Sequence, residues 1–249
     1  MEVHAHAHPS TGSGHQKKWT HYFWEFLMLF LAVFCGFLAE YQLEHKIEKE
    51  RGMEYIRSFN DDLKVNLPIF SRIIDFNNEK KIVLKDMSSC YDTLLKNWKN
   101  TSCLIQLVNY SQSFITASTT EGTMDQLKNA GGYRLLKKED RDSIILYDKD
   151  IRNYKGGEST VFQQSQDIVR NDFSMLLDYQ AHKFLYNDSV NTLTKTSLLF
   201  SANKEPLNKF FNDLLRYQQT INWQSGWIIW LKDRTIRLIE YFKSKYHFE

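Results

Sequence analysis

A long apolar segment close to the N-terminus constrains this chain more than any other feature. Residues 19–41 carry only two charged side chains, Glu25 near one end and Glu40 near the other. A helix rises about 1.5 Å per residue, so this segment reaches about 34 Å, enough to cross a hydrocarbon core about 30 Å thick. The sequence therefore predicts a single transmembrane helix over residues 19–41.

The residue types within the segment are those of a membrane anchor. Aromatic side chains near its ends are typical of interfacial belts, and the apolar residues between them favour insertion by about 3 to 5 kcal/mol. The residues expected to hold the anchor are Trp19, Trp24, Phe26, Leu27, Leu29, Phe30, Leu31, Val33, Phe34, Phe37, Leu38 and Tyr41. A cleaved signal peptide is disfavoured because no small-x-small pair precedes a plausible cleavage site. The aromatic flanks disfavour a buried helix of a soluble protein.

Polar and small residues fill the first eighteen positions, which predicts a disordered tail over residues 1–18. Within it His4, His6 and His8 alternate, so in an extended chain their imidazoles share one face and could converge on Zn²⁺, Ni²⁺ or Cu²⁺. The competing interpretation is a solvated tail that binds metal weakly, because ordering it costs conformational entropy. The sequence indicates no other cofactor.

Basic residues on both sides of the segment bear on its orientation. Lys17 and Lys18 precede it, and four basic residues follow between positions 46 and 57. Their count alone favours a cytoplasmic C-terminal side. That count applies to short loops, however, whereas more than 200 residues follow the span. We expect the N-terminus in the cytoplasm and residues 42–249 exported.

Beyond residue 41 the apolar residues recur at helical spacing. The clearest run steps by three and four and consists of Ile56, Phe59, Leu63, Leu67, Phe70 and Ile74. The chain has only 10 Gly and 3 Pro, which argues against an all-β fold with its many turns. We predict an all-α fold, in which the transmembrane helix runs on into an antiparallel bundle of about four to six long helices over residues 42–249.

Glycines and one proline mark changes along these helices. Pro68 predicts a kink or a boundary between two helices. Two glycines at positions 131–132 follow a short helix that ends at Asn129, which predicts a left-handed C-terminal cap. Two further glycines at positions 156–157 interrupt a long helical pattern and predict a bend or a close helix crossing.

Two helices are predicted at the C-terminal end. Asn203 can cap the first with its side chain, and the second lies around Gly226. Trp223, Trp227 and Trp230 form a stripe at helical spacing on this last stretch. Packing in the core is the favoured interpretation of the stripe, ahead of a membrane-interface or ligand surface.

The chain contains three cysteines, too few for a disulfide scaffold. Cys90 and Cys103 lie thirteen residues apart in the domain that we expect to be exported. There they could form a disulfide across a helix–loop–helix corner. Two small buried residues of a bundle are the favoured alternative.

No arrangement of residues indicates catalysis. Glu158, Asp167 and His182 are scattered along the predicted helices. The sequence holds no His-Glu-x-x-His, no phosphate-binding loop and no Gly-x-Ser-x-Gly elbow. The formal net charge is +2, so no global field favours nucleic acid. We therefore expect neither an enzyme nor a nucleic-acid-binding protein.

Two stretches of the sequence are similar to a known family. They are KKWTHYFWEFLMLFLAVFCGFLAE at 17–40, behind MEVHAH at 1–6, and QLKNAGGYRLL at 126–136. They resemble the N-terminus and an internal signature of a family of uncharacterised single-pass membrane proteins typical of Bacteroidetes. That family is defined by sequence and has no assigned catalytic residues. The resemblance implies a Gram-negative envelope, hence the inner membrane for a single span, and a native His-rich tail.

The function expected from these features is binding of a protein partner. A large helical domain without catalytic motifs, tied to a bilayer by one span, is typical of an interaction or scaffold module. A homo-oligomer is a further expectation, because Gly36 permits close approach of helices in the membrane. The alternatives are a ligand- or metal-sensing subunit, since helical bundles bind small molecules between helices, and an envelope enzyme with no recognisable motif.

Overall fold

The structure, a computed structural model, describes residues 19–179, 199 and 203–248. About 88% of these residues are helical and none of them forms a strand, so the described chain is all-α. An isolated antiparallel bridge joins Leu177 to Leu199. The predicted tail over residues 1–18, with its three alternating histidines, lies outside the described residues.

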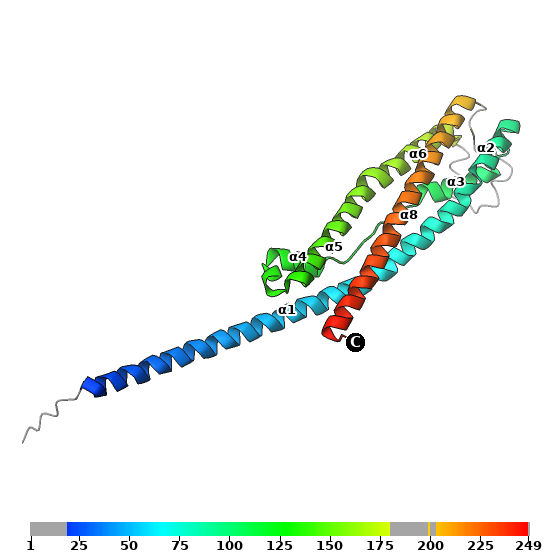
Figure 1. Cartoon of the computed structure of the whole chain (residues 1–249). Helices are drawn as coiled ribbons and strands as arrows, with labels where there is room; N and C mark the ends of the chain where they lie inside the picture. The colour runs from blue at the N-terminus through cyan, green and yellow to red at the C-terminus, as the bar shows by residue number, and fades with distance from the viewer. Residues whose placement is uncertain (1–18, 180–198, 200–202, 249) are drawn as a thin grey trace, which may run out of the picture. The chain divides into compact units, whose positions relative to one another are not determined.

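Helix α1 (Trp19–Lys85) is 67 residues long and joins the apolar segment to the following residues without a break (Figure 1). Among the described residues it is the one helix long and apolar enough to span a membrane. Pro68 lies inside α1, so the alternative of a helix boundary there is wrong. Proline removes one backbone hydrogen bond from the helix. Buried Asn66 and Phe70 on either side anchor both flanking turns in the protein interior.

The chain divides into two compact units, Met1–Arg51 and Gly52–Glu249. Every side chain from residue 42 to residue 51 is exposed, and the second unit begins at Gly52. A β-carbon built on Gly52 would lie 2.6 Å from the backbone oxygen of Leu135. Only glycine therefore permits this contact.

Two short helices follow α1, namely α2 (Met87–Lys96) and α3 (Ser102–Gln112). A disulfide joins Cys90 to Cys103, whose Cα atoms are 5.6 Å apart. Residues 113–121 then run without helical structure to α4 (Gly122–Asn129). Gly131 has φ 64°, which confirms the predicted left-handed turn, and the 3-10 helix η1 (Gly132–Leu135) follows.

A continuous helical stretch comes next, built from α5 (Lys138–Gly157), η2 (Glu158–Phe162) and α6 (Gln163–Leu176). The middle piece, η2, is a π-helical turn. A β-carbon on Gly157 would lie 3.2 Å from the Trp227 ring, which confirms the predicted close crossing at this glycine pair. The stretch contacts the C-terminal helix along its length (Figure 1).

The C-terminal helix α8 (Lys204–Tyr246) is a single helix of 43 residues, so the prediction of two helices here is wrong. Asn203 caps it as predicted, accepting a hydrogen bond from the Glu205 backbone N–H at 3.1 Å. Gly226 lies within the helix and costs about 1 kcal/mol relative to alanine. Burial of Ser225 and Ile228 beside it outweighs that cost.

Among the described residues, long helices are fewer than predicted. In the second unit the described residues contain three long stretches, namely the C-terminal part of α1, α5–α6 and α8. The other α-helices, α2, α3 and α4, have 8 to 11 residues each. The prediction of four to six long helices allows a boundary at Pro68 and divides the C-terminal stretch into two helices, and neither division is present in α1 or α8.

Apolar side chains of the second unit gather in two cores. Core 1 contains Phe59 of α1, Tyr147 of α5 and Phe242 of α8, and the Phe59 ring meets the other two edge to face. Core 2 surrounds the disulfide and contains Phe173 of α6 and Phe210 of α8. Helices α1 and α8 contribute to both cores, so each passes from one core to the other along its length.

Candidate functional site

Four buried polar side chains mark the level at which the long helices pass between the two cores. We call them the polar layer: Asn77 and Lys80 of α1, Gln166 of α6 and Gln224 of α8. Each is 2–4% exposed. A polar group buried this deeply is costly unless it is hydrogen-bonded, so its partners determine the helix packing here.

A chain of hydrogen bonds connects the polar layer to the segment of residues 113–121. Asn77 Nδ2 donates to Gln224 Oε1 at 3.1 Å, and Gln224 Nε2 donates to the Tyr154 hydroxyl at 3.1 Å. The Tyr154 hydroxyl in turn donates to Glu158 Oε1 at 3.2 Å. Glu158 also accepts from the Ala117 backbone N–H at 3.1 Å. Burial raises the pKa of Glu158, although these two hydrogen bonds act in the opposite direction.

Lys80 is the one buried amine of the polar layer. Its Nζ donates to the Tyr217 hydroxyl at 2.6 Å and to the backbone oxygen of Ser113. The rings of Phe76 and Tyr217 lie 4.9 and 5.2 Å from the same atom. Burial lowers the pKa of Lys80 to about 7. The amine is therefore partly uncharged near neutral pH, as expected for a lysine buried without a carboxylate partner.

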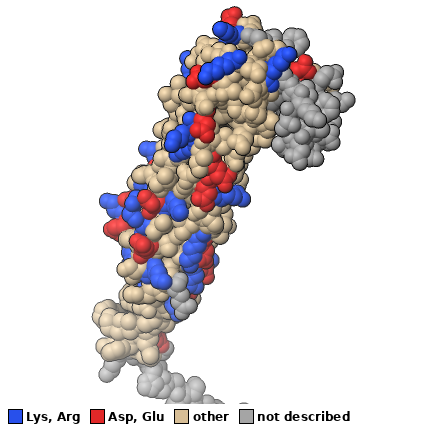
Figure 2. Space-filling view, turned by 90° about the vertical axis from the view of Figure 1, so that its right-hand side faces the viewer, with Lys and Arg blue, Asp and Glu red and all other residues tan. Residues whose placement is uncertain are grey.

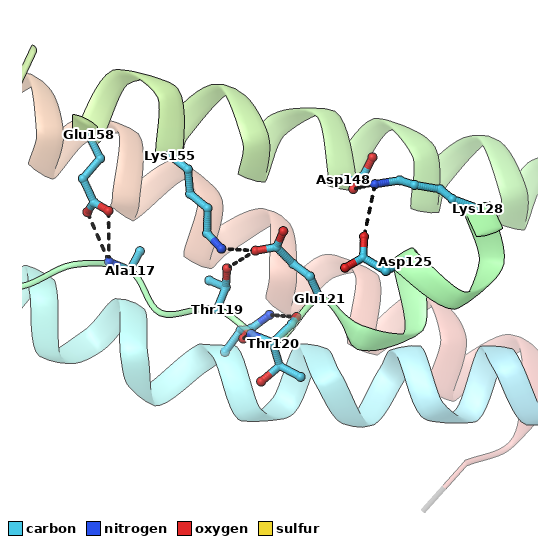
Figure 3. Close-up of polar contacts among 10 residues, drawn as sticks. Ala117, Thr119, Thr120, Glu121, Asp125, Lys128, Asp148, Lys155 and Glu158 are labelled. Atoms are coloured by element: carbon cyan, nitrogen blue, oxygen red, sulfur yellow. Dashed lines mark hydrogen bonds and ion pairs between the residues drawn. The ribbon is translucent and has the colours of Figure 1, made fainter. Parts of the chain in front are cut away.

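Side chains of the neighbouring helices form hydrogen bonds and an ion pair with the non-helical segment of residues 113–121 (Figure 3). Asn66 of α1 accepts from the Thr120 N–H at 2.7 Å and donates to the Thr120 oxygen at 3.2 Å. Lys155 of α5 pairs with Glu121 (Figure 3). Backbone groups outside a helix need such partners when they are buried. The segment of residues 113–121 therefore has a structural role, because it connects α1 and α5. The hydrogen bonds of the polar layer likewise favour a role in fixing the helix register over a role in ligand binding.

A row of exposed and partly exposed side chains on α8 is the second feature. We call Trp223, Trp227, Trp230, Arg234 and Arg237 the α8 stripe, because their spacing of three and four places them on one side of the helix. The prediction that the tryptophans pack in the core is wrong for Trp223 and Trp230, which are 50% and 41% exposed. Trp227 is half-buried between them.

Two tryptophans of the stripe, Trp223 and Trp227, pack against rings of the neighbouring helical stretch. Trp223 meets Phe162 of η2 with centroids 5.3 Å apart, and Trp227 meets Tyr154 at 5.6 Å. These contacts leave an exposed aromatic surface on a supported helix. The sequence shows the tryptophans of the stripe as a helical pattern. Which of them face solvent depends on the close helix crossing at Gly157.

The basic end of the stripe borders a hollow of about 350 Å³. Its lining is Asp142, Ser143, Leu146, Arg234, Arg237 and Leu238. Sequence reasoning missed these residues, because α5 and α8 bring together positions about ninety apart. A second hollow of about 500 Å³ lies along α1, where Arg72, Asp75 and Glu79 line it with both signs of charge.

The other predicted site residues are found as follows. His4, His6, His8 and His182 lie outside the described residues. Within the described ranges, no group of three or more His, Cys, Asp and Glu side chains could hold a metal ion. The anchor residues are exposed on α1, apart from partly buried Leu27. The most apolar part of this helix has no buried residue. Asp167 is exposed and pairs with Arg170.

No family model, no curated protein and no solved structure matches the chain.

Proposed function

We propose that this protein is a membrane-anchored helical scaffold that binds a protein partner through the α8 stripe. One observation carries the proposal, namely the exposure of Trp223 and Trp230 outside the apolar segment. Tryptophan and arginine are the residues most enriched at the energetic centres of protein interfaces. The stripe has both types at helical spacing on one rigid element.

We further propose that α1 crosses the bacterial inner membrane once, with a cytoplasmic N-terminus and an exported helical bundle. Apolar side chains exposed along the first part of α1 support the span, because a bilayer would cover them. The Cys90–Cys103 disulfide supports export, since disulfides persist in oxidising compartments such as the periplasm. The resemblance to single-pass membrane proteins of Bacteroidetes fits this arrangement.

Site-directed photo-crosslinking in intact cells tests the interaction. We replace Trp230 by p-benzoylphenylalanine and irradiate. A discrete adduct of higher mass is expected, and Trp223→Ala on the same chain is expected to weaken it several-fold because it removes part of the same surface. The matched control carries the crosslinker at Met175, an exposed apolar position on α6.

The pattern of adducts decides between outcomes. An adduct that is absent at position 175 and sensitive to Trp223→Ala supports a partner on the stripe. An adduct with the mass of two copies identifies the partner as a second copy of this chain. Equal adducts at both positions, or none at position 230, contradict the proposed function.

A further inference from the structure

Arg234 is held in place on two sides at the basic end of the α8 stripe. Its Nε lies 3.1 Å from Asp150 Oδ2 of α5, and its guanidinium lies 5.4 Å from the centroid of the Trp230 ring. Its side chain is largely buried. The ion pair and the ring restrict the guanidinium before any ligand arrives, although the Nε–Oδ2 contact is not a hydrogen bond.

Arg237 lies one turn further along α8 and lines the same hollow. It forms no ion pair with any described residue, whereas Asp142 on the opposite wall pairs with Arg141 at 3.3 Å. Because Arg234 is paired with Asp150, Arg237 is the arginine of the hollow whose donors no described carboxylate occupies in an ion pair. Leu146 and Leu238 supply the apolar part of the lining.

We propose that this hollow is a subsite for a carboxylate side chain, an Asp or Glu of the protein partner, bound by Arg237 beside the oriented Arg234. The inference rests on the proposed function and specifies the partner's chemistry. Positions 230 and 237 are separated by about 10 Å along the helix. The partner segment therefore has an apolar residue against Trp230 and an acidic residue about 10 Å away.

An acidic protein segment fits this site better than an anionic membrane surface does. The α5 side of the hollow carries Asp142, and Asp150 lies beside Arg234. Asp233 and Glu240 flank Arg237 on α8. A flat anionic surface would approach these four carboxylates together with the arginines, whereas a single side chain can reach Arg237 alone.

A small carboxylate tests the subsite without knowledge of the partner. We titrate the full chain, in zwitterionic nanodiscs and labelled with 5-fluorotryptophan, with 3-phenylpropanoate and follow the ¹⁹F signal of Trp230. The neutral analogue 3-phenylpropanamide is the matched ligand control. We expect a saturable shift in the millimolar range, which is what a ligand of this size reaches, and about tenfold weaker binding of the amide.

Two variants identify the residue that binds. Arg237→Gln is expected to weaken phenylpropanoate binding about tenfold. Lys243→Gln removes an exposed charge of the same helix outside the hollow and is expected to leave binding unchanged. The proposed subsite is overturned if the acid and the amide bind equally, if both variants lose affinity equally, or if the signal shift does not saturate. A Trp230 shift caused by inorganic phosphate at equal strength, or by phosphatidylglycerol in the nanodisc, overturns it in favour of a general anion or a lipid.

The crosslink at position 230 separates this inference from the proposed function. Loss of the adduct in Arg237→Glu but not in Lys243→Glu supports both the partner on the α8 stripe and the carboxylate subsite. An adduct that needs Trp223 but is unchanged in Arg237→Glu leaves the proposed function standing and overturns the carboxylate subsite.

Discussion

At the scale of single residues, Lys80 combines deep burial with hydrogen bonds that carry no opposing charge. The residue is 2% exposed, and its amine contacts a phenol, a backbone oxygen and two rings. Removal from water disfavours the ammonium form, and these contacts do not replace its hydration in full. The lowered pKa therefore makes the stability of the fold depend on pH.

The free energy of unfolding is expected to rise by roughly 2 kcal/mol between pH 7 and pH 9 because of Lys80. The pKa of Lys80 is about 7 in the folded protein against an ordinary value of 10.5. Between these values the unfolded chain holds a proton that the native amine lacks, so raising the pH favours the native state. Denaturant unfolding of the full chain in mild detergent, followed by tryptophan fluorescence, measures the effect.

Lys80→Met provides the comparison for this prediction. The variant leaves the Ser113 oxygen without its donor at every pH, which lowers stability by a similar amount throughout. It has no group to titrate, so its unfolding free energy is expected to lack the rise between pH 7 and pH 9. The same rise in both proteins would show that Lys80 is charged in the native state.

At the scale of elements, the contact between α1 and η1 depends on one missing side chain. Gly52→Ala is expected to destabilise the fold by about 1 to 3 kcal/mol, because its β-carbon would lie 2.6 Å from the Leu135 oxygen. Gly226→Ala is the matched control. Nothing lies within 4 Å of a β-carbon there, so higher helix propensity is expected to stabilise α8 slightly.

Thermal or denaturant unfolding of both variants checks this pair of expectations. Opposite signs are the expected result. Destabilisation of equal size in both would mean that Gly52 is not in close contact with η1.

Helix content follows from sequence more readily than helix ends do. The apolar spacing predicted the helices of residues 52–85, and Asn203 predicted the start of α8. The helix boundary allowed at Pro68 and the division of the C-terminal stretch into two helices did not occur. A proline or glycine costs a fixed amount locally, whereas burial of neighbours such as Phe70 and Ile228 depends on segments far away in the chain.

The polar layer shows that sequence reasoning is limited in the same way for the candidate site. Asn77 and Lys80 fall on the apolar side of α1, which is a visible signal in the sequence. Their partners, Gln224 and Tyr217, lie about 140 residues away. No local pattern relates such positions, so hydrogen-bond partners and the exposure of Trp223 and Trp230 required the packed structure.

At the scale of the whole molecule, charge does not select the partner by itself. Lysine and arginine alternate with aspartate and glutamate over the face shown in Figure 2, consistent with the net charge of +2. Long-range steering is therefore weak, and recognition depends on local features such as the α8 stripe.

The side of the membrane on which the second unit lies tests the account most directly. Met175→Cys, in a Cys35→Ala background, provides an exposed thiol on α6 while the Cys90–Cys103 disulfide stays intact. Cells of a Gram-negative host are treated with a membrane-impermeant maleimide after the outer membrane alone has been permeabilised. If the second unit is exported, the thiol at position 175 is modified under these conditions. Modification only after the inner membrane is opened would place the helical bundle in the cytoplasm and would overturn the proposed export.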